Sequence, residues 1–312
     1  MLKVLIADRV HPYLINELEK NNYKVDYRPS ISHSETLDII SDYFGIIINS
    51  KTKANKDFLD KATHLKFIGR LGSGLEIIDQ VYAEEKGVKV YNSPEGNRNA
   101  VAEHAIGMLL SLFNHLKKGD SEVRHFQWDR ESNRGLELEG KTIGIIGYGN
   151  TGSQLAKKLF GWDMTILAYD KYKKNFGSDH VKETGQNDIL ETADIISFHL
   201  PLTAETSGLM NKTFLEKAKK NVFIVNTSRG KVIDTNVLLD GLASGKIRGA
   251  CLDVFENEKV ETFTKEEREM YQKLYTYENV ILSPHVAGWT EESLFKIAST
   301  LIKKINADFA DV

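Results

Sequence analysis

The stretch Lys141-Thr-Ile-Gly-Ile-Ile-Gly-Tyr-Gly-Asn-Thr-Gly152 decides the fold class of this 312-residue chain. An apolar run predicts a strand up to Ile146, and a helical pattern follows Gly152. Gly147, Gly149 and Gly152 stand between them with the spacing G-x-G-x-x-G. The first glycine permits a tight turn, the second lets backbone approach a pyrophosphate, and the third lets helix and strand pack closely. The N–H groups of the following helix N-terminus, at Asn150 and Thr151, then favour phosphates. The stretch predicts a dinucleotide-binding unit.

An acidic residue stands where such a unit needs one. Asp170 ends the next predicted strand, about eighteen residues after the last glycine, where a carboxylate can accept both ribose hydroxyls. It favours NAD, because it would repel the 2′-phosphate of NADP. Lys171, Lys173 and Lys174 follow at once and keep NADP as the alternative. A glycine-rich turn with a solvated aspartate is the non-binding interpretation, and the strand–turn–helix context argues against it.

Short apolar runs alternate with helical patterns on both sides of this stretch. The predicted strands are residues 3–7, 24–27, 45–49, 66–68, 89–91, 142–146, 164–169, 195–198, 222–225, 247–253 and 280–282. The predicted helices include residues 13–20, 57–62, 77–86, 99–117, 152–159, 212–218 and 291–308. Repeated strand–helix units predict parallel α/β sheets. The helix over residues 99–117 has a continuous apolar stripe and a length of about 30 Å, enough to run between two domains.

Composition limits the class of protein. A chain of 312 residues suggests two domains, and 41% hydrophobic residues are enough for a substantial core. The net charge of -3 and the pI near 6.3 give no sign of nucleic-acid or membrane-surface binding. The single cysteine, Cys251, excludes an intrachain disulfide and a cysteine-rich metal site, and no metal is expected. Without a signal-peptide or membrane-spanning pattern, a cytoplasmic protein is expected.

Three charged or titratable residues follow predicted strands in the C-terminal half. Arg229, Glu258 and His285 come at or just after the ends of the runs at 222–225, 250–255 and 280–282. Ligands of open parallel sheets bind outside the carboxyl ends of the strands. A cation, a carboxylate and an imidazole placed there could bind an anion and move a proton. Taken singly, each residue is more often structural or solvated; together they predict an active site.

These segments resemble the D-isomer-specific 2-hydroxyacid dehydrogenases, a family that includes 3-phosphoglycerate dehydrogenases, glyoxylate/hydroxypyruvate reductases and D-lactate dehydrogenases. The resemblance covers nearly the whole chain. The segments that carry it are Gly72-Ser-Gly74 with Ile78-Asp79, Asn92-Ser-Pro-Glu-Gly-Asn97 with Val101-Ala-Glu103, Gly147 to Gly152, His199-Leu-Pro-Leu-Thr203, Asn226-Thr-Ser-Arg-Gly230, Asp253-Val-Phe-Glu-Asn-Glu258 and Ser283-Pro-His285.

The resemblance implies an α/β fold of two parallel-sheet domains, Rossmann-like and flavodoxin-like, with the active site in a cleft between them. Residues 1–98 plus 288–312 would form a discontinuous substrate domain, and residues 99–287 the NAD-binding domain. Family members are usually homodimers joined through the nucleotide domain. The implied reaction is hydride transfer between nicotinamide C4 and C2 of a D-2-hydroxy acid.

The resemblance also implies a role for individual residues. His285 would exchange the hydroxyl proton, Glu258 would favour the imidazolium, and Arg229 would hold the carboxylate and the C2 oxygen. The backbone N–H groups of Ser73 and Gly74 would bind the substrate carboxylate. The remaining cofactor contacts would come from Asp253 at the carboxamide and from His199, Pro201 and Thr227 along the cofactor. His199 is explained almost as well as a core histidine, and His104 is interpreted as structural.

The substrate is less well defined. Asn49 and Lys51 stand where phosphoglycerate dehydrogenases generally offer arginine, and Lys51 or Arg70 could meet a phosphate. We rank 3-phosphoglycerate first by a small margin, then glyoxylate or hydroxypyruvate. Lys259 replaces a usual proline and predicts a looser loop, and Trp289 replaces a small residue. An NAD-sensing protein of the transcriptional corepressor type is the alternative outside enzymes.

Overall fold

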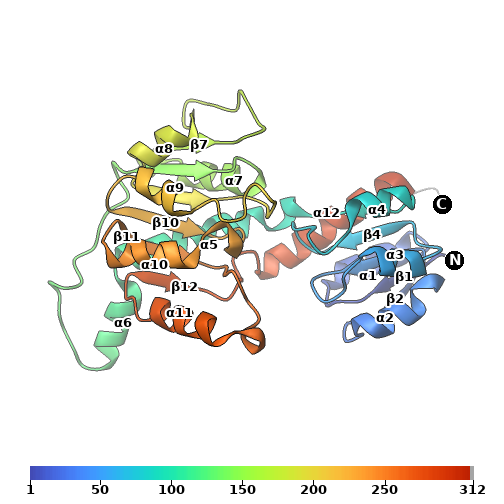
Figure 1. Cartoon of the computed structure of the whole chain (residues 1–312). Coiled ribbons are helices and arrows are strands. Elements are labelled where there is room, and N and C mark those ends of the chain that lie inside the picture. The colour runs from blue at the N-terminus through green and yellow to red at the C-terminus, as the bar shows by residue number, and fades with distance from the viewer. Residues whose placement is uncertain (310–312) are drawn as a thin grey trace. The chain divides into compact units, whose positions relative to one another are not determined.

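The computed structural model describes residues 1–309, and the chain divides into two compact units. The first is Met1–Arg98 with Trp289–Val312, and the second is Asn99–Gly288. In Figure 1 the first unit therefore combines the blue N-terminal part with the red helix α12 (Glu291–Phe309). The chain enters the second unit within helix α5 (Pro94–Phe113) and leaves it after Gly288.

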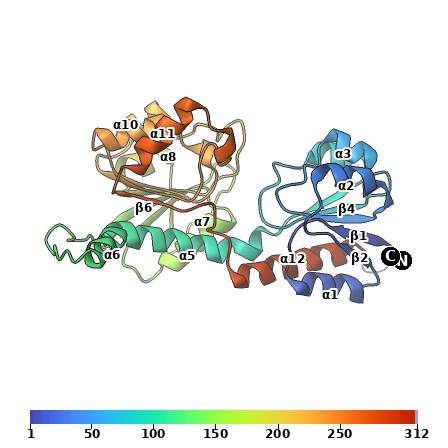
Figure 2. The ribbon, with the colours of Figure 1, turned by 90° about the horizontal axis from the view of Figure 1, so that it is seen from below.

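The first unit is built on a five-stranded parallel sheet of order β2-β1-β3-β4-β5, the flavodoxin-like order. The strands are β1 (Lys3–Ile6), β2 (Lys24–Tyr27), β3 (Gly45–Ile48), β4 (Phe67–Arg70) and β5 (Lys89–Tyr91). One face packs on α2 (His33–Ile39), α3 (Lys56–Lys61) and α4 (Gln80–Glu85), and the other on α1 (Pro12–Lys20) and α12 (Figure 2). The fully buried strand β3 reads Gly-Ile-Ile-Ile, as a strand covered on both faces should.

The second unit is built on a seven-stranded parallel sheet of order β12-β11-β10-β9-β6-β7-β8. The strands are β6 (Thr142–Ile146), β7 (Thr165–Tyr169), β8 (Lys182–Glu183), β9 (Ile195–Phe198), β10 (Val222–Asn226), β11 (Ile247–Leu252) and β12 (Val280–Leu282). Read from β6, this is the Rossmann order, in which the connection reverses between β6 and β9. The prediction of two parallel α/β sheets is confirmed.

Helices cover both faces of this second sheet (Figure 2). α5 and α7 (Asn150–Leu159) share one core layer, and the other layer holds α8 (Gln186–Thr192), α9 (Lys212–Lys217), α10 (Thr235–Ala243) and α11 (Lys265–Tyr275). α7 buries Leu155, Ala156 and Leu159 against the sheet. Short 3-10 turns lie at Ile40–Asp42, Gly230–Val232 and Val260–Thr262.

The prediction of one helix over residues 99–117 is wrong at both ends. α5 begins at Pro94, a residue suited to a first helical turn, and ends at Phe113. His115 then adopts a left-handed conformation, with φ of 50°, which interrupts the helix before α6 (Leu116–Arg124) begins. The helix predicted from residue 77 also starts later, because Asp79 caps α4 through the N–H of Tyr82.

Candidate active site

The three glycines of the turn after β6 differ in what a side chain would meet there. Gly147 has φ of +95°, and a Cβ there would lie 2.3 Å from the carbonyl oxygen of His199. A Cβ on Gly152 would lie 2.0 Å from the carbonyl oxygen of Gly147. A Cβ on Gly149, in contrast, would meet no described atom within 4 Å. The first and third glycines serve the turn and the packing of α7, while the second leaves backbone open to a ligand.

The start of α7 has the features of an anion site. Gly149 is its N-cap, and within residues 1–309 no side chain caps it, so N–H groups of Asn150 and Thr151 point outward at the positive end of the helix. At the end of β10, the buried Oγ1 of Thr227 has no hydrogen-bond partner among the described residues. A buried hydroxyl in this state is rare unless a ligand or water completes it. The residues present therefore fit a bound dinucleotide.

Asp170 is held by backbone donors at the carboxyl end of β7. Its carboxylate accepts the N–H groups of Tyr148, Tyr172 and Lys173, each at 2.9 Å. Burial alone would raise the pKa of Asp170, but these three hydrogen bonds lower it below its usual value, so the group stays ionised. Lys171 is paired with Glu205 at 2.8 Å. The geometry leaves a negative charge beside the glycine turn.

His199 follows β9 and is buried beside the start of α7. Its Nε2 lies 2.8 Å from Ser197 Oγ and its Nδ1 lies 3.1 Å from Thr151 Oγ1. Burial lowers its pKa to about 4, so the ring is neutral near neutral pH. Both ring nitrogens thus have protein partners, as in a core histidine that orients α7. Pro201, two residues further on, is exposed.

His285 and Glu258 form a pair across two loops. His285 Nδ1 lies 2.8 Å from Glu258 Oε2, and both side chains are partly exposed. The hydrogen bond to Glu258 raises the pKa of His285 against the opposing effect of burial. Burial would raise the pKa of Glu258, but the contact with His285 lowers it. The contact with Glu258 occupies Nδ1 and leaves Nε2 as the nitrogen that could exchange a proton with a ligand.

Arg229 lies close enough to this pair to influence the pKa of both Glu258 and His285. Its loop is fixed by Asn226, whose amide donates to the Arg229 carbonyl at 2.9 Å and accepts from Ser228. Gly230 brings this loop against the next one, because a Cβ there would lie 1.9 Å from the carbonyl carbon and oxygen of Phe255. The structure thus brings the three predicted residues together at one edge of the sheet.

Asp253 has a structural function that the sequence does not reveal. Its buried carboxylate accepts Ser283 Oγ at 2.6 Å and the N–H groups of Val286 and Ala287 at 2.9 and 2.8 Å. His104 of α5 lies 2.9 Å from the same Ser283 hydroxyl. Asp253 therefore holds the loop that carries His285, and its predicted contact with a carboxamide stays a prediction. Ser283 and Gly230 belong to sequence motifs, but their spacing alone gives no sign of these contacts.

The predicted substrate residues belong to the first unit and lie after its strands. Asp8, beyond β1, accepts the N–H of Asn49 at 2.7 Å and lies 3.7 Å from Lys51 Nζ, which also donates to the Pro29 carbonyl at 2.6 Å. Asn92 donates to the Ser73 carbonyl at 2.8 Å and so fixes the Gly72-Ser-Gly74 loop. Arg70 Nη1 donates to the carbonyl of Leu71 at 2.6 Å. Trp289 is mostly exposed.

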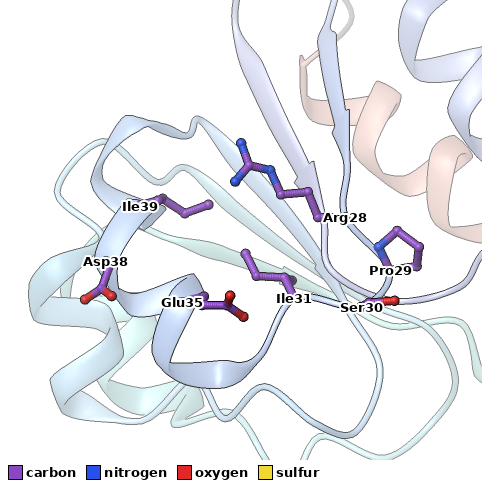
Figure 3. Close-up of a pocket in the computed structure, with 7 residues that line it drawn as sticks. All are labelled: Arg28, Pro29, Ser30, Ile31, Glu35, Asp38 and Ile39. Carbon is purple, nitrogen blue, oxygen red and sulfur yellow. The ribbon is translucent and has the colours of Figure 1, made fainter.

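A pocket of about 510 Å³ lies beside α2 in the first unit. Figure 3 shows Arg28, Glu35 and Asp38 around it. Arg28 is already paired with Asp26 at 2.8 Å, and none of the predicted site residues lines this pocket. We therefore place the candidate site at the strand ends of the second unit. Among residues 1–309, no cluster of three or more His, Cys, Asp or Glu side chains is arranged to hold a metal ion, and no helix is long and apolar enough to span a membrane.

Residues 106–287 match the family described as D-isomer specific 2-hydroxyacid dehydrogenase, NAD binding domain. The chain belongs to the D-isomer-specific 2-hydroxyacid dehydrogenases. The chain is similar to a D-3-phosphoglycerate dehydrogenase of Methanocaldococcus jannaschii, 36% identical over 307 residues, which cover 97% of this chain and 56% of that protein. A hydroxypyruvate reductase of Thermotoga maritima is 36% identical over 275 residues, 88% of each chain.

Among solved structures, this member of the family is similar to a D-lactate dehydrogenase from Aquifex aeolicus complexed with NAD and lactic acid. The identity is 28% and the TM-score 0.85, and the match covers 98% of this chain and 95% of the other. The chain spans about half the length of the curated D-3-phosphoglycerate dehydrogenases that it matches. The family's NAD-binding domain thus coincides with the sheet that carries the glycine turn, Arg229, Glu258 and His285.

Proposed function

We propose that the chain catalyses NAD-dependent hydride transfer between nicotinamide C4 and C2 of a D-2-hydroxy acid. The observation that carries the proposal is the His285–Glu258 pair, 2.8 Å apart, beside Arg229 and on the same sheet as the glycine turn. NAD, when bound, supplies the hydride acceptor. Asp170 favours NAD over NADP, because its ionised carboxylate would face the 2′-phosphate.

The protein residues have to handle one proton and one carboxylate. In oxidation, His285 Nε2 takes the hydroxyl proton while Glu258 stabilises the resulting imidazolium through Nδ1. In reduction, the protonated ring returns that proton to the C2 oxygen. Arg229 binds the substrate carboxylate with its guanidinium fork and polarises the C2 oxygen. Separately, we propose that the backbone N–H groups of Ser73 and Gly74, in the first unit, can bind a carboxylate.

The substrate is proposed as a small D-2-hydroxy acid. 3-Phosphoglycerate is the first candidate, because several curated relatives are D-3-phosphoglycerate dehydrogenases. Hydroxypyruvate is the second, because Lys51 is already engaged by Asp8 and the Pro29 carbonyl, which weakens it as a phosphate ligand. The hydroxypyruvate reductase relative also matches most of its own length.

One assay tests the proposal. NADH oxidation is followed by absorbance with glyoxylate, hydroxypyruvate, pyruvate and 3-phosphohydroxypyruvate, and NADH binding is measured separately by fluorescence. We expect turnover with at least one of these acids. Tight NADH binding without turnover on any of them would contradict the dehydrogenase proposal and favour a sensing protein. The ratio of kcat/KM for the phosphorylated and unphosphorylated acids decides between the two candidate substrates.

The proposal includes a homodimer joined through the nucleotide-binding unit. Four large apolar side chains of α6 and the segment after it are mostly exposed: Leu116, Val123, Phe126 and Trp128. Phe126 is 98% exposed and Trp128 78% exposed. Large apolar side chains exposed in this way favour an interaction surface, and a second copy is the partner that the family's usual assembly implies.

A further inference from the structure

The loop that carries Glu258 is wrapped around one buried ring. It runs from Phe255 to Phe263, and its two phenylalanine rings lie 6.0 and 4.9 Å, centroid to centroid, from the ring of Tyr271 on α11. Tyr271 is only 1% exposed. The apolar ends of the loop are thus anchored on α11, while Glu258 between them is partly exposed. Something else must fix the polar middle of the loop.

Asn257, directly before Glu258, connects the polar middle of the loop to α11. Its N–H donates to Tyr271 Oη at 3.1 Å, and its Nδ2 donates to Thr262 Oγ1 at 3.1 Å and Glu267 Oε1 at 3.2 Å. Its Oδ1 accepts the N–H of Lys259 at 3.0 Å. One side chain therefore ties the residue after Glu258 and the far end of the loop to α11. These hydrogen bonds restrain the backbone on both sides of Glu258.

Glu258 depends on this geometry for two contacts at once. Its Oε1 accepts the N–H of Phe255 at 3.2 Å, and its Oε2 lies 2.8 Å from His285 Nδ1. A rotation of the backbone at Asn257 or Lys259 would move the carboxylate away from the ring. The charged groups that influence His285 are Glu258, Asp253 and Arg229. Of these, Asp253 is held within the sheet edge by Ser283, whereas Glu258 is held by its own loop.

We propose that Asn257 is a positioning residue that keeps Glu258 hydrogen-bonded to His285 by fastening the loop to α11. The inference rests on the proposed catalytic function of His285 and Glu258. It assigns Asn257 no contact with substrate or cofactor. Asn257 acts by holding the Glu258 carboxylate close to the His285 imidazole. Its effect should therefore be measurable in the titration of His285 without substrate or cofactor.

The test compares Asn257→Ala with Asn211→Ala in the full chain. Asn211 caps α9 by accepting the N–H of Phe214 at 3.0 Å, so it is a structural asparagine of the same unit. Both variants lose side-chain hydrogen bonds and some thermal stability. The pKa of His285 is measured from its imidazole NMR signals, and kcat and KM from NADH oxidation. We expect Asn257→Ala to lower the His285 pKa and to reduce kcat by about tenfold, with a much smaller change in KM.

Asn211→Ala should leave both the His285 pKa and kcat close to wild type. A folded Asn257→Ala variant with unchanged His285 titration and unchanged kcat would overturn the inference. Tyr271→Phe keeps the ring and removes only the hydroxyl that accepts the Asn257 N–H, so a smaller shift in the same direction is expected. That variant decides the question if Asn257→Ala does not fold. If the wild type turns over no keto acid, the proposed function fails, while the His285 titration still tests the positioning of Glu258.

Discussion

His285 lies in the left-handed region with φ of 55°, an unusual conformation for a residue other than glycine or asparagine. Asparagine tolerates this region well, so His285→Asn removes the imidazole with little backbone cost. We expect NADH affinity close to wild type, because the glycine turn and Asp170 are untouched. Turnover should fall by roughly 10² or more, since no group of suitable pKa replaces the ring. NADH fluorescence titration and steady-state rates check both; turnover within a few-fold of wild type would assign the proton to another residue.

Glu258 sets the pH range in which His285 is protonated. Reduction of a keto acid needs the imidazolium, so kcat/KM should fall as the pH rises through the elevated pKa of His285. Glu258→Gln removes the negative charge, so that descending limb should move to lower pH. The folded pKa is above the unfolded value of about 6.5, so the stabilising effect of the pair is complete below that value and is lost as the pH rises through the folded pKa. A pH profile that does not move would show that Glu258 does not control the ring.

Gly230 allows the loops of Arg229 and Glu258 to touch. In Gly230→Ala the new methyl would lie 1.9 Å from backbone atoms of Phe255, which cannot turn aside as a flexible side chain can. We expect a loss of about 1–3 kcal/mol in the free energy of unfolding and a marked fall in kcat. The control is Gly107→Ala on α5, where a Cβ meets no described atom within 4 Å; it should be neutral or stabilising by up to about 1 kcal/mol. Urea unfolding gives the free energy of unfolding of both variants. Equal values for Gly230→Ala and Gly107→Ala would contradict the close approach of Gly230 to Phe255.

At the scale of elements, variants in the β6–α7 turn can distinguish a loss of cofactor binding from a loss of stability. In Gly149→Ala the methyl meets no described protein atom, and φ of -85° suits alanine, so the free energy of unfolding should change by less than about 0.5 kcal/mol. The same methyl would occupy the backbone face assigned to the pyrophosphate, so NADH affinity should fall about tenfold or more. Gly152→Ala is the contrasting variant, because its methyl would clash with Gly147 and destabilise the fold. If Gly149→Ala bound NADH as tightly as the wild type, the turn would not be part of the cofactor-binding site.

Strands could be predicted from the sequence more closely than helices. Buried parallel strands are nearly continuous apolar runs, so β6, β9 and β12 have the predicted bounds. The break after α5 could not be predicted, because Leu112 and Leu116 keep helical spacing across it and only the backbone of His115 interrupts the helix. The helices α2, α8, α10 and α11 do not stand out in the sequence, since short helices owe their ends to caps such as Ser32 and Thr264 rather than to long periodicity.

The candidate site, too, could be predicted from the sequence only in part. Arg229, Glu258 and His285 could be named because each follows a recognisable strand, and strand ends converge at one sheet edge. The contacts that hold them could not be named, because they join residues far apart in the chain. Ser283 with Asp253, Gly230 with Phe255, and Asn257 with Tyr271 become partners only after the sheet has formed. The prediction of a looser loop at Lys259 missed the hydrogen bond from its N–H to Asn257.

At the scale of the whole molecule, the exposed aromatic residues after α6 predict an assembly. A dimer of this 35.2 kDa chain would have a mass of about 70 kDa, which light scattering after size-exclusion chromatography measures directly. The double variant Phe126→Ser with Trp128→Ser should shift the mass toward that of one chain. Its matched control is Phe160→Ser, another exposed aromatic residue of the same unit, which should not. A wild-type chain that elutes as a monomer at micromolar concentration would contradict the homodimer.

The discontinuous first unit has a consequence for biosynthesis. Val4, Ile6, Ile47 and Phe67 belong to a core layer that α12 helps to close, yet α12 follows all of the second unit in the chain. At about 5–20 residues per second, the ribosome makes that intervening segment in roughly 10–40 s. The second unit has its whole sequence only at the end of this interval, and until then α1 is the one described helix that covers this face of the N-terminal sheet. We therefore expect apolar side chains on this face of the nascent N-terminal part to stay exposed until α12 has been synthesised.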